Sequence, residues 1–265
     1  MRRLAQRRVA VGATAMLACA GCQALACADA RPVRAPTVTG QSPPATRPPR
    51  AVGCLARPPR FREHGAARRR AVALTFDGGP TGYTPRVLAA LHRYRAHATF
   101  FLVGRFIPAH AWLVRRELKE GDELANHSYT HPHLPSFGQL SHTSALIRRV
   151  SGFTPCLFRA PYGEVNARLI ADAWRLRMST IQWSVDTLDS LGAGPRTVYR
   201  RATALARPGS IILMHDGDGD YAGSLGMLPG ILSALRRRHL QVVTVSRLLG
   251  FRTRWARPRR RAPTR

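Results

Sequence analysis

Short apolar segments alternate with amphipathic ones along the chain from residue 71 to residue 250. The apolar segments favour β structure, and the amphipathic segments repeat their apolar residues with helical spacing. The predicted strands are residues 72–76, 98–103, 123–126, 157–159, 178–185, 210–214 and 241–245. The predicted helices are residues 85–94, 109–120, 138–150, 165–176, 195–206 and 228–238.

Seven strands that alternate with six helices predict parallel β–α–β units. Such units build either an open sheet or a closed barrel, and the periodicity alone does not choose between the two. We therefore expect one α/β domain over residues 71–250.

Polar side chains follow several of these strands at the point where each strand ends. Asp77 closes the stretch AVALTFDGGP, in which two glycines and a proline stop the strand at once. Further polar residues at predicted strand ends are Asn126, His127, Arg159, Asp186, Asp189, His215 and Asp216. Because the carboxyl ends of parallel strands share one rim, the sequence predicts an active site there.

Each of these residues also has a structural interpretation when it is taken alone. Asp77 could cap the following helix, and His215 could be a hydrogen-bonded core histidine. Arg159 could reach solvent from its strand end, or it could hold a rim carboxylate in its ionised form. His127 and His131 lie four residues apart, a spacing that lets two imidazoles reach one cation but also suits two surface histidines.

The basic residues are concentrated at the two ends of the chain. The chain has 42 Lys and Arg residues against 14 Asp and Glu, which gives a net charge of +28. Residues 1–70 hold 14 arginines and two acids, and residues 252–265 hold seven arginines and no acid. These arginines lie among proline and alanine rather than among aromatic residues, so we expect no specific nucleic-acid partner. Solvated basic ends can bind any polyanion, including an anionic cell wall.

The first 30 residues have the layout of a secretory signal peptide, because four arginines precede an uncharged run that ends in small residues. An uncleaved signal anchor and a lipoprotein signal are the alternatives. We expect a secreted or cell-wall-associated monomer, without a membrane span once the signal is cleaved. Residues 31–70 are predicted to be a Pro/Arg-rich disordered linker, and residues 251–265 a basic disordered tail. Cys54 and Cys156 could pair in an oxidising compartment, although the sequence does not show that they lie close.

Five segments, in their order along the chain, resemble the five motifs of the polysaccharide deacetylases, the NodB homology domain of carbohydrate esterase family four. The segments are AVALTFDGGP, NHSYTH, LFRAPYG, WSVDTLDS and IILMHD. The resemblance covers residues 70–250. It implies a deformed seven-stranded (β/α) barrel, similar to a TIM barrel, which removes acetyl groups from N-acetylated sugars of peptidoglycan, chitin or similar polymers. It also implies a divalent metal, usually zinc.

The resemblance implies roles for individual residues. Asp77 is implied as the catalytic base, and Arg159 as the arginine that orients it. The backbone N–H of Tyr162 is implied as an oxyanion donor. His215 is implied as the general acid, and Asp189 as the aspartate that tunes it. The implied metal ligands are His127 and His131, and Leu213 is implied as a wall of the acetyl pocket.

Two residues depart from the pattern of the family. The family motif TFDDGP has a second aspartate that completes the metal site, but this chain has Gly78 there. Two histidines without that carboxylate lack a ligand and a negative charge, so we expect a lower metal affinity unless water, Asp77 or His133 takes the open position. Ser190 stands where the family usually has the tryptophan that closes the acetyl pocket.

Two hypotheses of function follow. The first is a secreted, metal-dependent hydrolase of carbon–nitrogen bonds that deacetylates a cell-wall glycan, either peptidoglycan or a chitooligosaccharide. The second is a glycan-binding protein that kept the fold and lost efficient turnover through Gly78 and Ser190. The presence of a base, an acid and both supporting residues favours the enzyme, since a binding protein has no use for the complete set.

Overall fold

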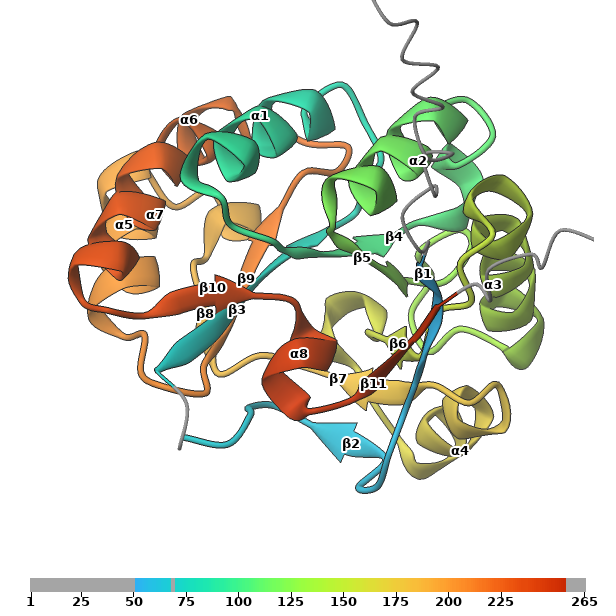
Figure 1. Cartoon of the computed structure of the whole chain (residues 1–265). Coiled ribbons are helices and arrows are strands. Elements are labelled where there is room, and N and C mark those ends of the chain that lie inside the picture. The colour runs from blue at the N-terminus through green and yellow to red at the C-terminus, as the bar shows by residue number, and fades with distance from the viewer. Residues whose placement is uncertain (1–50, 68–69, 256–265) are drawn as a thin grey trace, which may run out of the picture. The chain divides into compact units, whose positions relative to one another are not determined.

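The computed structural model of the chain describes residues 51–67 and 70–255. The predicted signal peptide, residues 31–50 of the predicted linker and residues 256–265 of the predicted tail lie outside the described residues (Figure 1).

Nine strands in the described residues form one parallel sheet (Figure 1). They are β2 (Phe61–Arg62), β3 (Ala71–Asp77), β4 (Thr99–Leu102), β5 (Glu123–Asn126), β6 (Leu157–Phe158), β7 (Ser179–Ile181), β8 (Val185–Asp186), β9 (Ile211–His215) and β10 (Gln241–Val243). Their order is β2-β7-β6-β5-β4-β3-β9-β8, and β10 pairs with the first half of β3. β9 lies along one edge of β3, and β10 and β4 share its other edge.

β3 is the buried centre of this sheet, since all seven of its residues are buried. Its nearly continuous apolar sequence is typical of a parallel strand that is covered on both faces. The strand ends at Asp77, which pairs with His215 of β9 on one side and Phe101 of β4 on the other. The register therefore places the predicted base and the predicted acid on neighbouring strand ends.

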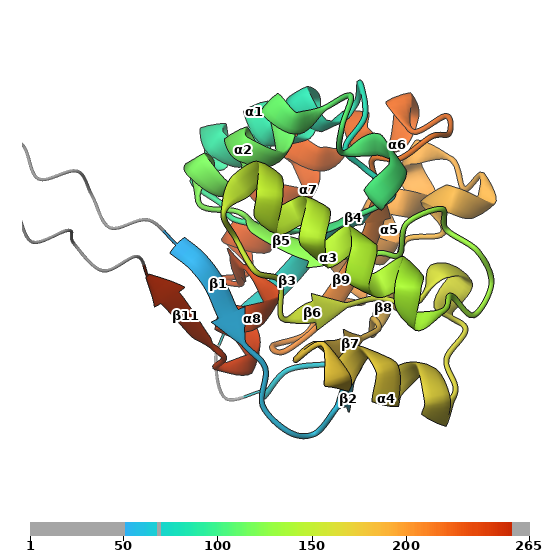
Figure 2. The ribbon, with the colours of Figure 1, turned by 90° about the vertical axis from the view of Figure 1, so that its right-hand side faces the viewer.

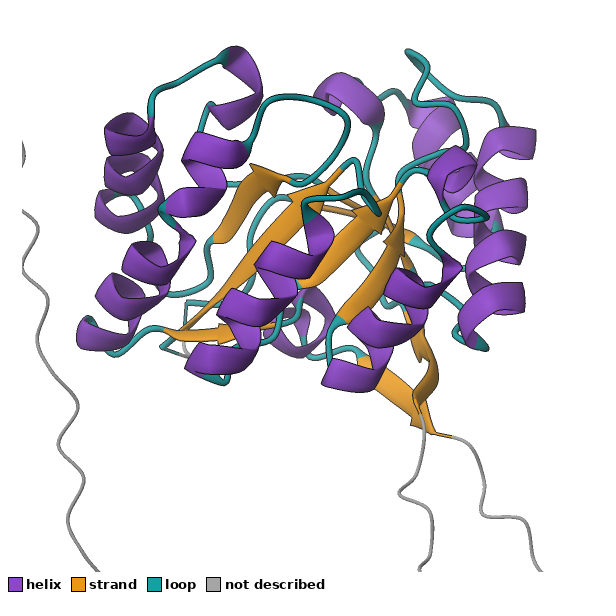
Figure 3. Ribbon diagram, turned by 90° about the horizontal axis from the view of Figure 1, so that it is seen from above, coloured by secondary structure: helices purple, strands orange, loops and turns teal. Residues whose placement is uncertain are grey.

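Helices surround the curled sheet (Figure 3). The longer ones are α1 (Thr84–Tyr94), α2 (Ala111–Glu120), α3 (Phe137–Ser151), α4 (Ala167–Arg175), α5 (Pro195–Ala204) and α7 (Leu228–Arg237). The short ones are η1 (Gly104–Phe106), η2 (Pro161–Gly163), η3 (Asp189–Leu191), α6 (Ala222–Gly226) and α8 (Val245–Leu249). All six predicted helices are present. Within the part of the chain that the structure describes, no helix has the length and apolar character needed to span a membrane.

The predicted strand over residues 178–185 is two strands, which corrects the expected count. β7 pairs with β6 and β2 at one end of the strand order, whereas β8 pairs with β9 at the other end. The amide of Gln182 donates to Arg62, and the amide of Ser184 donates to Ile211. Residues 182–184 thus cross the gap where a complete barrel would close, so the α/β prediction of a deformed barrel is confirmed in an open form.

Two predictions of disorder are wrong for the parts of those segments that are described. β1 (Ala51–Leu55) pairs antiparallel with β11 (Arg252–Trp255), and these strands lie side by side in Figure 2. β2 joins the main sheet beside β7. A disulfide joins Cys54 in β1 to Cys156, which directly precedes β6. Long-range pairing orders these proline-rich segments, which carry no periodic pattern of their own, and the folded part extends beyond residues 71–250 at both ends.

The disulfide is expected to stabilise the protein, because it connects positions separated by 102 residues of sequence. We expect the double variant Cys54→Ser, Cys156→Ser to lower the free energy of unfolding by about 2 to 4 kcal/mol, since the cross-link restricts the unfolded chain. Urea denaturation followed by circular dichroism measures this change. Wild-type protein treated with reductant should unfold at a similarly lowered urea concentration. An unchanged urea midpoint in both samples would contradict the expectation.

Candidate active site

A buried ion pair lies at the carboxyl end of β3. Nη1 of Arg159 is 2.7 Å from Oδ1 of Asp77, and both side chains are almost completely inaccessible to solvent. The guanidinium also donates to the hydroxyl of Thr75 and to two backbone carbonyls, and it lies 4.0 Å from the centre of the Phe101 ring. With its donors paired, Arg159 can remain charged in the core and fix the orientation of Asp77.

The two histidines of the NHSYTH segment lie next to this pair. Nδ1 of His127 is 2.9 Å from the carbonyl oxygen of Arg159. A carbonyl can only accept, so Nδ1 carries the proton and the lone pair is on Nε2, which lies 3.6 Å from Oδ2 of Asp77. Burial lowers the pKa of His127 to about 4 and also lowers the pKa of His131. The ring centres of the two histidines are 4.8 Å apart.

Two neutral imidazoles suit a divalent cation in the kind of ligand they provide. Gly78 adds no third side chain. Within residues 51–67 and 70–255, no three potential ligands in this cavity have all their donor atoms within 4.8 Å of one another. The group that meets this limit is Cys54, Glu123 and Cys156, whose cysteines form the disulfide. The cavity residues therefore fit a cation, but with one ligand fewer than the family pattern.

His133 does not join the other two histidines. Its Nδ1 is 2.9 Å from Oε1 of Glu164, and its ring stacks on that of Tyr162 with 4.0 Å between the centres. Tyr162 has a left-handed φ of 56°, and the residue is 59% exposed at the mouth of the site. The prediction that His133 could take the open metal position has no support from this arrangement.

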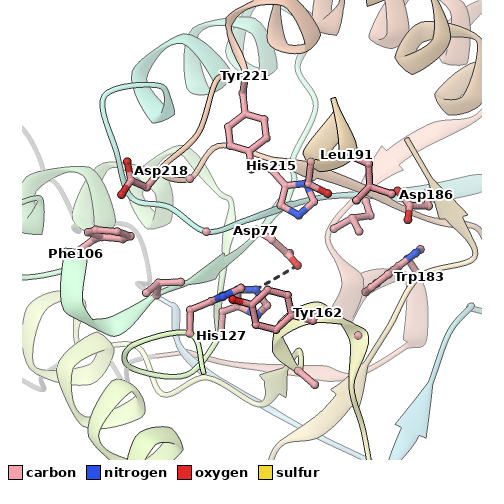
Figure 4. A pocket seen from close by; sticks show the side chains of 18 of the residues that line it. Asp77, Phe106, His127, Tyr162, Trp183, Asp186, Leu191, His215, Asp218 and Tyr221 are labelled. Carbon is pink, nitrogen blue, oxygen red and sulfur yellow. Dashed lines mark ion pairs between the residues drawn. The ribbon is translucent and has the colours of Figure 1, made fainter. Parts of the chain in front are cut away.

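A second oriented pair comes from β9 and η3. Nδ1 of His215 is 2.8 Å from Oδ1 of Asp189, and the His215 amide donates to Oδ2 of the same carboxylate. Since the carboxylate accepts the Nδ1 proton, Nε2 is left on the cavity side, above Asp77 (Figure 4). Burial lowers the pKa of His215, but the hydrogen bond and the negative charge of Asp189 outweigh it, so the pKa is raised above its usual value. The pair can therefore present a protonated imidazole.

One cavity of about 710 Å³ brings these predicted residues together. Its lining includes the predicted Asp77, His127, His131, Tyr162, Leu213 and His215, together with Gly78 and Ser190. Arg159 and Asp189 lie behind this lining and hold Asp77 and His215. Other lining residues were not predicted from the sequence: Phe106, Trp183, Leu191, Asp218 and Tyr221 (Figure 4). Asp218 follows His215 by three residues, so a wider search after each strand end would have found it, whereas the apolar residues carry no comparable pattern.

The backbone explains why residue 78 is glycine. Gly78 has a φ of +94°, which side-chain-bearing residues rarely adopt, and a Cβ atom there would lie 3.0 Å from Cα of Gly217. The amide of Asp216 donates to the carbonyl of Asp77 at 3.1 Å, which holds the two loops together. An aspartate at residue 78 would have to adopt this strained φ and would require the facing backbone at Gly217 to shift by a few tenths of an ångström, so the absence of that carboxylate is coupled to the packing of the loop after β9.

Comparisons with known proteins agree with this geometry. Residues 64–181 match the family model described as polysaccharide deacetylase. A peptidoglycan-N-acetylglucosamine deacetylase of Bacillus cereus is 33% identical over 189 residues, which cover 68% of this chain and 69% of that protein. A second relative is the peptidoglycan-N-acetylmuramic acid deacetylase PdaC of Bacillus subtilis, which is 35% identical over 187 residues. The match covers 68% of this chain but only 39% of that protein.

Solved structures show the same relationship. The crystal structure of the Bc1960 peptidoglycan N-acetylglucosamine deacetylase matches with a TM-score of 0.69 at 32% identity, over 72% of this chain and 92% of that one. BA3943 of Bacillus anthracis, described as a CE4 family pseudoenzyme, matches with a TM-score of 0.66 at 27% identity, over 71% of this chain and 68% of that one. The predicted resemblance is confirmed: the chain belongs to the polysaccharide deacetylase family of hydrolases.

Proposed function

We propose that this protein is a secreted, metal-dependent deacetylase that removes N-acetyl groups from a cell-wall glycan, either peptidoglycan or a chitin-like polymer of N-acetylglucosamine. The observation that carries the proposal is the pair of oriented groups in one cavity, Asp77 held by Arg159 and His215 held by Asp189. Similarity to peptidoglycan deacetylases supports the substrate class. The predicted signal peptide supports secretion to the cell wall.

Asp77 is the base in this proposal. Arg159 donates a hydrogen bond to Oδ1 of Asp77, so Oδ2 is the oxygen available to accept a proton from the attacking water. A cation held by His127 and His131 would supply Lewis-acid polarisation of the amide carbonyl. The backbone N–H of Tyr162 is assigned to the developing oxyanion, and Leu213 to the wall around the acetyl methyl group.

His215 is the acid. An amine is a poor leaving group unless it is protonated as the carbon–nitrogen bond breaks. Because Asp189 accepts the Nδ1 proton, Nε2 of His215 is the atom that delivers a proton to the departing nitrogen. Water thus adds to the carbonyl carbon, Asp77 takes one of its protons, His215 donates another, and the products are acetate and the free amine.

The pH dependence of acetate release tests this assignment. The active form has protonated His215, so activity should fall as the pH rises through its pKa, which Asp189 helps to raise. We expect Asp189→Asn to lower that pKa and to move the alkaline limb of kcat/KM to lower pH. Asp220→Asn, two residues before α6, is the matched control and should leave the limb in place. An alkaline limb that does not move in Asp189→Asn would contradict the role of His215.

A second candidate function is supported by Gly78. A cation held by two histidines without a charged third ligand is bound less tightly, so the protein could bind glycan without efficient turnover. A similar structure is itself described as a pseudoenzyme. Retention of N-acetylglucosamine oligomers without acetate release, in protein supplied with zinc, would favour this candidate over the deacetylase.

A further inference from the structure

The loop after β9 occupies the place toward which a side chain at residue 78 would point. A Cβ on Gly78 would lie 3.0 Å from Cα of Gly217, and a Cβ on Gly217 would lie 2.9 Å from Cα of Gly78. Both contacts are closer than ordinary packing, so this approach depends on two glycines that face each other. The space that a residue-78 carboxylate would need is therefore filled by the backbone of residue 217.

Hydrogen bonds fix this loop to the turn after β3. The Thr81 hydroxyl donates to the carbonyl of Asp216, and the Thr84 hydroxyl donates to Oδ2 of Asp216 at 2.6 Å. Asp216 is completely buried and does not line the cavity, and Oδ2 of its carboxylate anchors the loop. The next acidic residue along the loop is Asp218, two positions beyond this anchor.

Asp218 does line the cavity, together with His127 and His131. Figure 4 shows Asp218 beside Phe106 and opposite Trp183, with its carboxylate directed away from His127. Asp218 is exposed, and no hydrogen bond or ion pair of its carboxylate is found among the described residues. Glycines on either side of it, Gly217 and Gly219, leave the carboxylate free of bulky neighbours in sequence.

We propose that Asp218 supplies the carboxylate ligand that this chain lacks at residue 78, so that His127, His131 and Asp218 together hold the divalent cation. This inference rests on the proposed metal-dependent function. Two neutral imidazoles bring no negative charge to a cation, and one carboxylate adds both a charge and an oxygen ligand. A set of three protein ligands leaves positions open for water and substrate, as a catalytic metal site requires.

The other polar groups near the site are less suitable. Oδ1 of Asp77 is held by Arg159, and its Oδ2 is the atom needed as the base. His133 is engaged with Glu164, and Oδ1 of Asp186 accepts the Leu188 amide at 2.7 Å. Among the described residues, the donor atoms of His127, His131 and Asp218 do not all lie within 4.8 Å of one another. The assignment therefore requires the exposed carboxylate of Asp218 to turn toward the two histidines when the cation binds.

Zinc affinity tests the assignment without reference to turnover. Zinc is titrated into the purified, metal-free protein in competition with a chromogenic chelator, for the wild type, Asp218→Asn and the matched control Asp220→Asn. We expect the affinity of Asp218→Asn to fall by at least about tenfold, and that of Asp220→Asn to change by less than about twofold. Cobalt substitution should show a changed visible absorption spectrum in Asp218→Asn alone, because the number and kind of ligands change.

Two outcomes overturn the assignment. Equal zinc affinity of the wild type and Asp218→Asn, while His131→Gln weakens binding, would mean that the site does not include Asp218. Equal weakening in Asp218→Asn and Asp220→Asn would mean that the effect is one of general charge. Neither result bears on acetate release, so the proposed deacetylase would stand. The proposed deacetylase function fails separately if the zinc-loaded wild type releases no acetate.

Discussion

The substitution Asp77→Asn is expected to slow acetate release by about 10² to 10⁴-fold, because an amide cannot accept the proton of the attacking water. The new side chain still offers an oxygen to Arg159, so the position of the guanidinium should change little. The buried charge of Arg159, however, loses its counterion. We therefore also expect the free energy of unfolding to fall by about 3 kcal/mol. Initial rates of acetate release and urea denaturation measure the two effects on the same preparation.

A matched variant separates the role of Asp77 from a general effect of charge. Asp172 on α4 forms ion pairs with the exposed Arg168 and Arg175, and it does not line the cavity. Asp172→Asn should leave acetate release unchanged and should alter the unfolding free energy by no more than about 1 kcal/mol. If Asp77→Asn released acetate as fast as Asp172→Asn, another group would have to be the base.

The substitution His215→Gln is expected to slow deacetylation of an N-acetylated sugar by about 10² to 10⁴-fold, since no other group is assigned to protonate the departing amine. An aryl acetate carries a leaving group that departs without protonation. The same variant should therefore lose much less activity on the aryl ester than on the amide, whereas Asp77→Asn should lose activity on both. Paired rate measurements on the two substrates distinguish an acid from a residue that only shapes the cavity.

The control for this variant is the same substitution at an exposed histidine. His142 lies on α3 and stacks on Tyr129, away from the cavity lining. His142→Gln should leave both rates unchanged. If His215→Gln lost activity on the amide and on the aryl ester by the same factor, the assignment of His215 as the acid would be contradicted.

The sequence predicted the main elements of the fold because the pattern of apolar positions is local. β5 has the predicted bounds, and β3 extends the prediction by one residue at each end. The break between β7 and β8 was not predictable, because it depends on which strands lie at the two open edges of the sheet. The short strands β1, β2 and β11 depend on pairing with distant segments, and proline and arginine dominate the sequence around them.

The family resemblance implied the catalytic residues and the two pairs Arg159–Asp77 and Asp189–His215, but the individual atoms that meet and the apolar lining were not predicted. Strand ends on one sheet identify Asp77, Arg159 and His215 as neighbours, whereas the partner of each polar atom depends on distances that only the structure gives. The sequence also identified Gly78 as a departure from the family. Its close contact with Gly217, and the resulting position of Asp218, follow from the packing of two loops whose residues lie 139 positions apart.

The most direct test of the proposed function is a zinc titration of the purified, metal-free protein, with acetate release from N-acetylglucosamine oligomers measured at each point. We expect acetate release to rise with zinc occupancy, to reach its maximum at a single zinc ion per chain and to disappear when a chelator removes the metal. Zinc-saturated protein that binds the oligomers and releases no acetate, or acetate release that persists after the metal is removed, would contradict a metal-dependent deacetylase.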